Sequence, residues 1–175
     1  LSPLIVLVYP FAKRFTSWPQ AILGFAFAYG ALLGWTAQTG SLGWPAVWLY
    51  LAAIFWTIGF DTIYALQDKR DDSIAGVRST ALLFGERVRL AVGALYLCSA
   101  ALAQLAVSAA HAGGATQIGV EIGVLAYAAH LAWQVARTDA KIAPSVALML
   151  FRSNRDAGLL LFAGFAAQGF LSAYS

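Results

Sequence analysis

Three aspartates near the middle of the chain have the spacing and residue type best suited to chemistry. If residues 59–72 form one continuous helix, Asp61, Asp68 and Asp72 fall on one face, with Tyr64 about one turn along the same side. Carboxylates stacked at the end of an apolar segment repel one another unless a cation offsets them. Oxygen ligands favour a hard divalent ion, and Mg²⁺ held by few carboxylates completes its shell with water and phosphate oxygens. The spacing therefore predicts a magnesium site for a phosphorylated ligand.

Basic residues at two places in the chain could face this acidic row across a phosphate group. Lys13 and Arg14 form a pair, with Tyr9 one turn before Lys13 on the same face, and Arg78 follows the aspartates. Each feature also has a simpler explanation. The acidic segment could be a solvated loop neutralised by its own basic residues, and Lys13 and Arg14 could contact lipid headgroups. The residues alone leave these alternatives open.

Long apolar segments must position these charged groups. Of the 175 residues, 61% are hydrophobic and 11% are charged, against about 45–50% and about 25% in soluble domains, which excludes a water-soluble core. A spanning helix needs about 20 apolar residues. We expect one partial span at 1–8, a short interfacial helix at 79–84, and five full spans, at 18–38, 44–66, 88–108, 117–136 and 156–174. The predicted fold is an all-α, polytopic transmembrane bundle that forms a single domain over residues 1–175.

The loops between these spans alternate in charge. Lysine and arginine occur in the segments 11–17, 61–89 and 137–155, whereas 38–43 and 109–116 contain neither. Because consecutive spans reverse direction, the three basic segments share one side, which the positive-inside rule assigns to the cytoplasm. The net charge of +3 thus reports topology, and nucleic acid is set aside as a partner. A single cysteine excludes a disulfide framework and a cysteine-based zinc site.

Polar residues near the last two spans are expected to be structural. Asn154 and Asp156 precede the final span and are predicted to cap its helix, although their position on the cytoplasmic side leaves contact with an active-site cavity open. His130 lies within an apolar span and has no second metal ligand at a suitable spacing, so we expect it to serve helix packing.

Three stretches of the sequence together resemble the UbiA prenyltransferase family, in its 4-hydroxybenzoate polyprenyltransferase branch. They are YPFAKRFTSWPQAILG at 9–24, DTIYALQDKRDD at 61–72 and GVRSTALLFG at 76–85. The resemblance covers essentially the whole chain and implies a bundle of about nine helices, of which this chain would form the C-terminal portion. The family's first motif, Asn-Asp-x-x-Asp-x-x-x-Asp, has no counterpart here. We therefore expect this chain to be inactive on its own.

The resemblance also implies roles for individual residues. Asp68 and Asp72 match the family's second motif, Asp-x-x-x-Asp, and would bind Mg²⁺ and diphosphate. Tyr64 matches a tyrosine that lines the same site, and Lys13 matches the diphosphate-binding lysine, with Arg14 as its basic neighbour. We assign these last three residues to catalysis, and hypothesise that Arg14 binds the carboxylate of 4-hydroxybenzoate.

Three further residues are assigned to substrate binding. Asp61 and Arg78 match family motif positions, and Tyr9 adjoins Lys13 on its helical face. Two magnesium ions between the two aspartate motifs would stabilise the departing diphosphate. Lys13 and Arg78 would add to that stabilisation.

The implied reaction is magnesium-dependent transfer of a polyprenyl group from polyprenyl diphosphate to 4-hydroxybenzoate, at the ring carbon ortho to the hydroxyl, in ubiquinone biosynthesis. The site must hold the ring against C1 of the prenyl group and exclude water. The tail gains about 0.8 kcal/mol per buried CH₂ and can enter from membrane lipid. A bacterial inner membrane, with the site facing the cytoplasm, is favoured over a mitochondrial inner membrane.

Three rival functions remain. Another branch of the same family would use homogentisate, a naphthoate or haem as acceptor. An ion-coupled membrane transporter also places carboxylates within or beside the membrane. The least specific rival is a helical structural subunit with a solvated acidic loop.

Overall fold

The computed structural model describes residues 12, 14–110 and 118–173, without the side chains of 172 and 173. This part of the chain is helical and contains no strand, which confirms the all-α prediction. Its elements are α2 (Pro19–Phe27), α3 (Tyr29–Thr39), α4 (Trp44–Ala65), α5 (Lys69–Ile74), α6 (Thr80–Phe84), the short 3-10 helix η1 (Gly85–Arg87), α7 (Val88–Ala110), α8 (Ile118–Arg137), α9 (Pro144–Arg152) and α10 (Asn154–Ala173).

Four helical segments within the described residues are long and apolar enough to cross a membrane: Pro19–Thr39, Trp44–Ala65, Thr80–Ala110 and Ile118–Arg137. They correspond to the first four full spans predicted from the sequence, and the polytopic helical bundle is confirmed. The fifth predicted span, 156–174, falls on α10, a helix of 20 residues. The partial span at 1–8 lies outside the described residues.

Local sequence explains where these helices begin and end. Proline occupies the first turn of α2 and of α4, where a helix needs no N–H from it. Gly40 ends α3 with φ +72°, a backbone conformation that glycine adopts without a side-chain clash. The predicted interfacial helix is α6, in which Ser79 accepts a hydrogen bond from the Leu82 amide at 3.3 Å.

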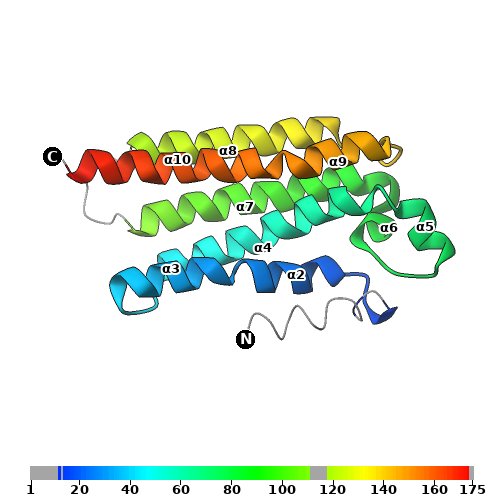
Figure 1. Cartoon of the computed structure of the whole chain (residues 1–175), viewed down its shortest axis with the longest axis horizontal. Helices are drawn as coiled ribbons and strands as arrows, with labels where there is room; N and C mark the ends of the chain where they lie inside the picture. Colours follow the sequence, from blue (N-terminus) through cyan, green and yellow to red (C-terminus); the bar gives the residue numbers. More distant parts are fainter. Residues whose placement is uncertain (1–11, 13, 111–117, 174–175) are drawn as a thin grey trace.

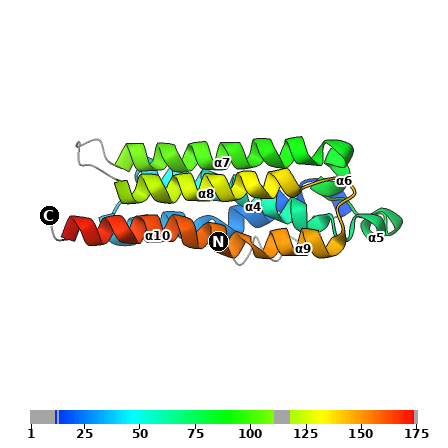
Figure 2. The same ribbon diagram turned by 90° about the horizontal axis from the view of Figure 1, so that it is seen from above.

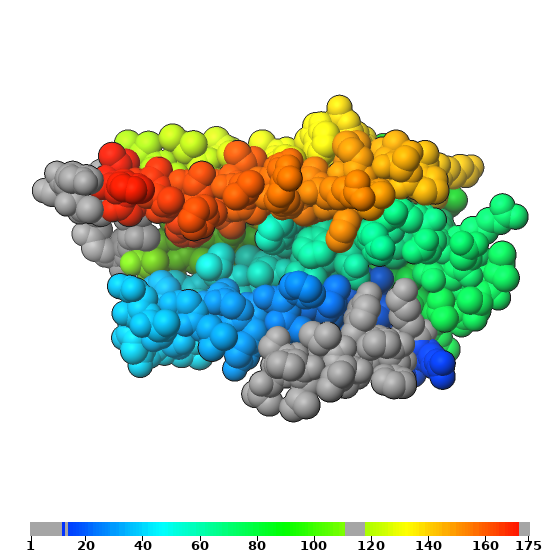
Figure 3. All heavy atoms as spheres, in the orientation of Figure 1, coloured from blue at the N-terminus to red at the C-terminus, as the bar shows by residue number. Residues whose placement is uncertain are grey.

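The helices lie side by side along one long axis (Figures 1 and 2). Helix α4 packs between α7 on one side and α2 with α3 on the other, and α8 packs between α7 and α10. Short helices α5 and α6 lie at one end of the bundle, together with the turn between α8 and α9. Figure 3 shows α10 and α9 as one continuous ridge along the molecule. The bundle thus collects its short connecting helices at a single end.

Helices α8 and α10 approach each other closely through glycine. A Cβ atom built on Gly123 would lie 2.7 Å from the Cα of Gly164. One built on Gly119 would lie 3.0 Å from the Gln168 amide nitrogen. Because no side chain separates the two backbones there, α10 approaches α8 closely over its C-terminal half.

Candidate active site

The aspartate segment is not one continuous helix, so the prediction that Asp61, Asp68 and Asp72 form a single helical row is wrong. Helix α4 ends at Ala65, and α5 begins at Lys69 with Asp68 at its N-cap position. Between them the Gln67 amide group donates to the Tyr64 carbonyl at 3.1 Å. Asp61 lies in α4 and is buried, at 6% exposure. Asp68 and Asp72 instead belong to the start of α5.

Asp68 and Asp72 remain together after this break. The Asp72 amide donates to the Asp68 carbonyl at 2.7 Å, so one helical turn separates the two residues. Asp68 is exposed and Asp72 is half-buried. No group of three or more His, Cys, Asp or Glu residues within the described ranges could hold a metal. Two carboxylates one turn apart nevertheless fit Mg²⁺, which is commonly bound through one or two carboxylates with substrate phosphates and water.

The loop that follows α5 folds back on these aspartates. The Val77 amide donates to the Asp72 carbonyl at 3.1 Å. Arg78, next in the chain, donates from its guanidinium to the Phe15 carbonyl at 3.1 Å. The structure thus brings Arg78 beside the segment that holds Arg14, and Arg14 is itself exposed. Lys13 and Tyr9 lie outside the described residues.

Helix α6 is tied to two spans, which fixes the loop in place. The Thr62 and Thr80 hydroxyl oxygens lie 2.6 Å apart, both fully buried. The Thr80 amide donates to the Gln20 side-chain oxygen at 3.3 Å, and Gln20 is also buried. The charged loop therefore has a fixed position over the ends of α2 and α4.

A row of aromatic side chains leads from the aspartates into the bundle. Trp56, Phe60 and Tyr64 follow one another at every fourth position of α4, directly before Asp68. The rings of Trp56 and Phe60 meet edge to face with centroids 5.7 Å apart. Phe151 of α9 packs against Phe60 at 5.8 Å and against Tyr64 at 4.6 Å. Tyr64, the last ring of this row, lies at the end of α4, next to the turn that carries Asp68.

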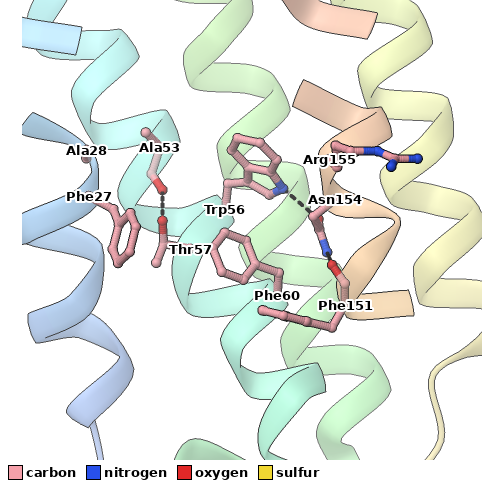
Figure 4. Close-up of a pocket in the computed structure, with 9 residues that line it drawn as sticks. All are labelled: Phe27, Ala28, Ala53, Trp56, Thr57, Phe60, Phe151, Asn154 and Arg155. Atoms are coloured by element: carbon pink, nitrogen blue, oxygen red, sulfur yellow. Dashed lines mark hydrogen bonds between the residues drawn. The ribbon is translucent and has the colours of Figure 1, made fainter. Parts of the chain in front are cut away.

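This row borders a cavity of about 350 Å³ between α2, α4 and the junction of α9 with α10 (Figure 4). Its lining is mostly apolar: Phe27, Ala28, Ala53, Trp56, Thr57, Phe60, Phe151, Asn154 and Arg155. The Arg155 guanidinium points away from the cavity in Figure 4. The cavity can hold an apolar or aromatic group close to the carboxylate end of the bundle.

Asn154 has a different role from the predicted helix cap. Its side-chain nitrogen donates to the carbonyls of Leu150 and Phe151, at 3.2 and 3.1 Å. Its side-chain oxygen accepts from the Trp56 indole N–H at 2.8 Å (Figure 4). Sequence reasoning missed Trp56, Phe60 and Phe151 as lining residues. The aromatic spacing that ends at Tyr64 could have signalled Trp56 and Phe60, whereas Phe151 lies in another helix and carries no such signal.

Comparison with known proteins identifies the family of the chain. The model of the UbiA prenyltransferase family matches residues 1–155. The chain is 44% identical over 165 residues to the mitochondrial 4-hydroxybenzoate polyprenyltransferase of Mus musculus, covering 93% of this chain and 42% of that protein. It is 43% identical over 159 residues to the mitochondrial 4-hydroxybenzoate polyprenyltransferase of Dictyostelium discoideum, covering 89% of this chain and 33% of that protein.

A bacterial relative is similarly close. The 4-hydroxybenzoate octaprenyltransferase of Ectopseudomonas mendocina is 40% identical over 157 residues, covering 89% of this chain and 51% of that protein. The chain thus spans between a third and about half of the length of these relatives. No solved structure matches. From the match of the family model over most of its length, the chain belongs to the UbiA prenyltransferase family.

Proposed function

We propose that this chain contributes the Asp68–Asp72 side of a site that transfers a polyprenyl group from polyprenyl diphosphate to 4-hydroxybenzoate. The observation that carries the proposal is the aromatic row from Trp56 to Tyr64, which joins a carboxylate pair to an apolar cavity. An isoprenoid diphosphate has the same two parts, an anionic head and an apolar body. The names of the relatives supply the acceptor.

Asp68 and Asp72 would hold Mg²⁺, which supplies charge neutralisation to the departing diphosphate when it is bound. Arg78 is fixed near this end through the Phe15 carbonyl, and its charge would face the same phosphate oxygens. Arg14, exposed beside Phe15, remains our candidate for the acceptor carboxylate. Lys13 and Tyr9 would complete the basic side, and Asp61, in the last turns of α4, would belong with Tyr9 and Arg78 to the substrate-binding residues.

In the reaction the C1–O bond of the prenyl diphosphate breaks, and its electron pair leaves with the diphosphate. The ring carbon ortho to the hydroxyl then forms a bond to C1, and its proton passes to the released diphosphate, which restores the aromatic ring. Tyr64, Phe60 and Phe151 would hold the allylic group and the ring in contact and keep water away from C1. The site would face the cytoplasm of a bacterial inner membrane, or the corresponding side of a mitochondrial one.

Substitution of single aspartates in the complete protein tests the proposal. Prenyl transfer to labelled 4-hydroxybenzoate should fall about 100-fold in Asp68→Asn and in Asp72→Asn, the size expected when a group that stabilises developing charge is lost. Asp71→Asn is the matched control, because it removes the same charge from the adjacent, exposed position of α5. Equal activity in all three variants would refute the assignment.

Metal removal and acceptor choice refine the same test. A chelator should abolish transfer, and added Mg²⁺ should restore it. Homogentisate and a naphthoate, offered in place of 4-hydroxybenzoate, should give little product. Efficient transfer to either of them would support a prenyltransferase but contradict 4-hydroxybenzoate as its acceptor.

A further inference from the structure

A groove with a basic rim lies between the C-terminal end of α8 and helix α9, next to the cavity described above, with Arg155 bordering both. Its volume is about 810 Å³, within the range of about 300–1,000 Å³ usual for small-molecule sites. Trp133 and His130 of α8 form one wall, and Ser145 and Met149 of α9 form the other.

The groove exists because the last two helices change partner at Ser153. Helix α10 packs along α8, whereas α9 packs on α4. Helix α9 ends at Arg152, and Ser153 separates it from α10. Beyond this break α9 diverges from α8 and leaves the space open. The groove is therefore a consequence of the fold.

Hydrogen bonds fix the floor of the groove. The Ser153 hydroxyl accepts from the Gln134 side-chain amide at 3.1 Å and lies 3.2 Å from the His130 Nε2 atom. Gln134 is fully buried, and its oxygen accepts from the Tyr96 hydroxyl at 2.6 Å. This chain of contacts joins the break between α9 and α10 to α8 and α7.

The rim carries an excess of positive charge. Arg152 and Arg155 both line the groove, and the Arg137 guanidinium lies over the Trp133 ring, 4.6 Å from its centroid. Asp156 is the one carboxylate that lines it, and it pairs with Arg155 at 2.9 Å. Neither Arg152 nor Arg137 has a carboxylate partner among the described residues. Two guanidinium groups therefore remain to bind an anion.

The position of the groove within the bundle identifies the kind of anion. Arg137 is the last residue of α8, a helix of 20 residues and thus about 30 Å long. His130 and Trp133 lie in its last two turns, so the groove opens at the boundary between headgroups and acyl chains. Tryptophan and arginine are typical of this boundary, and basic pockets between helices on the cytoplasmic or matrix side bind anionic headgroups. The apolar walls of Leu148 and Met149 suit an acyl chain.

We propose that the groove between α8 and α9 binds the phosphate headgroup of an anionic phospholipid of the inner leaflet, with Arg152 and Arg137 on the phosphate and one acyl chain along Met149. This binding does not depend on the prenyl transfer proposed above. Its test measures lipid binding without an activity assay, so either proposal can fail alone.

Fluorescence quenching in vesicles of phosphatidylcholine tests the proposal. The vesicles contain a lipid with brominated acyl chains, which is phosphatidylglycerol in one series and phosphatidylcholine in the other. The fluorescence of the Trp133→Phe variant is subtracted from that of the unmodified protein to give the signal of Trp133. At equal content, the brominated phosphatidylglycerol should quench Trp133 more strongly. Arg152→Gln should weaken the apparent binding of phosphatidylglycerol about fivefold, the effect expected for one basic side chain at a membrane surface. Arg87→Gln, which removes an exposed charge from η1 outside the groove, should leave it unchanged.

A second variant protects the test against misfolding of Arg152→Gln. Ser145→Phe fills the groove at an exposed position of α9 without changing the charge, and it should also abolish the preference for phosphatidylglycerol. Equal quenching by the two lipids in the unmodified protein would overturn the proposal. So would loss of the preference when inorganic pyrophosphate is added, because the groove would then bind a soluble phosphate anion.

Discussion

At the scale of single residues, Trp56 links the cavity wall to the break between α9 and α10. Its indole N–H donates to the Asn154 side-chain oxygen at 2.8 Å, and Asn154 is 7% exposed. Trp56→Phe keeps an aromatic ring and removes this donor, so it should cost about 1 kcal/mol of stability. For a protein of this size that corresponds to a melting temperature lower by about 2–4 °C, measured by thermal unfolding in detergent.

Trp48→Phe is the matched control for that measurement. Trp48 is a half-buried tryptophan of the same helix, stacked on Trp44, and its indole has no hydrogen-bond partner within the described part of the chain. The same loss of ring area should therefore lower the melting temperature less. Equal shifts in the two variants would mean that packing, and not the hydrogen bond to Asn154, stabilises the cavity wall.

Residue periodicity predicted part of the candidate site correctly and part of it wrongly. The pairing of Asp68 with Asp72 needs one helical turn, and that turn is present. The inclusion of Asp61 needed an unbroken helix, and residues 60–72 contain no glycine or proline that would signal a break. A contact between residues 18 positions apart accompanies the break, because the Thr80 hydroxyl lies 2.6 Å from that of Thr62 and holds α6 against α4. Such contacts cannot be inferred from local spacing.

At the scale of elements, the contact between α8 and α10 depends on glycines, which have no side chain to keep the two backbones apart. Gly123→Ala would place a Cβ 2.7 Å from the Gly164 Cα, where only the two backbones could move. Overpacking of this kind costs about 1–3 kcal/mol, so the melting temperature should fall. Gly30→Ala is the control, since nothing lies within 4 Å of a Cβ built there. That change should leave stability equal or raise it, because alanine favours a helix by about 1 kcal/mol over glycine.

The same elements show why spans were easier to predict than their packing. The length of each apolar run sets a helix, and the four predicted spans correspond to helical segments of the structure. The third segment, Thr80–Ala110, begins eight residues before the predicted span because α6 and η1 precede α7. Which helices touch depends on side-chain shape along each face. The sequence of 119–123 and 164 contains glycines, yet only the three-dimensional arrangement shows that they meet. If Gly123→Ala melted at the temperature of the unmodified protein, the close approach of α8 and α10 would be incorrect.

At the scale of the whole molecule, charge separates the two ends of the bundle. Helices α5 and α6 and the turn between α8 and α9 lie at one end (Figure 1). The Arg89 guanidinium, at the start of α7, holds the turn between α8 and α9 at this end, since it donates to the Thr138 carbonyl at 2.7 Å and pairs with Asp139 at 3.6 Å. The turn between α3 and α4, at 40–43, lies at the other end and contains no charged residue. The positive-inside rule therefore predicts that Ser73, in α5, faces the cytoplasm and that Ser41 faces outward.

Labelling of introduced cysteines with a membrane-impermeant maleimide tests this orientation. The one native cysteine, Cys98, is first replaced by serine. In intact bacterial cells Ser41→Cys should be labelled and Ser73→Cys should not, and opening the inner membrane should make Ser73→Cys reactive. Both positions are exposed. Along the chain, α4 is the span that lies between Ser41 and Ser73. The opposite pattern would place the aspartate end outside the cell, away from cytoplasmic substrates. Labelling of both positions in intact cells would mean that α4 does not cross the membrane.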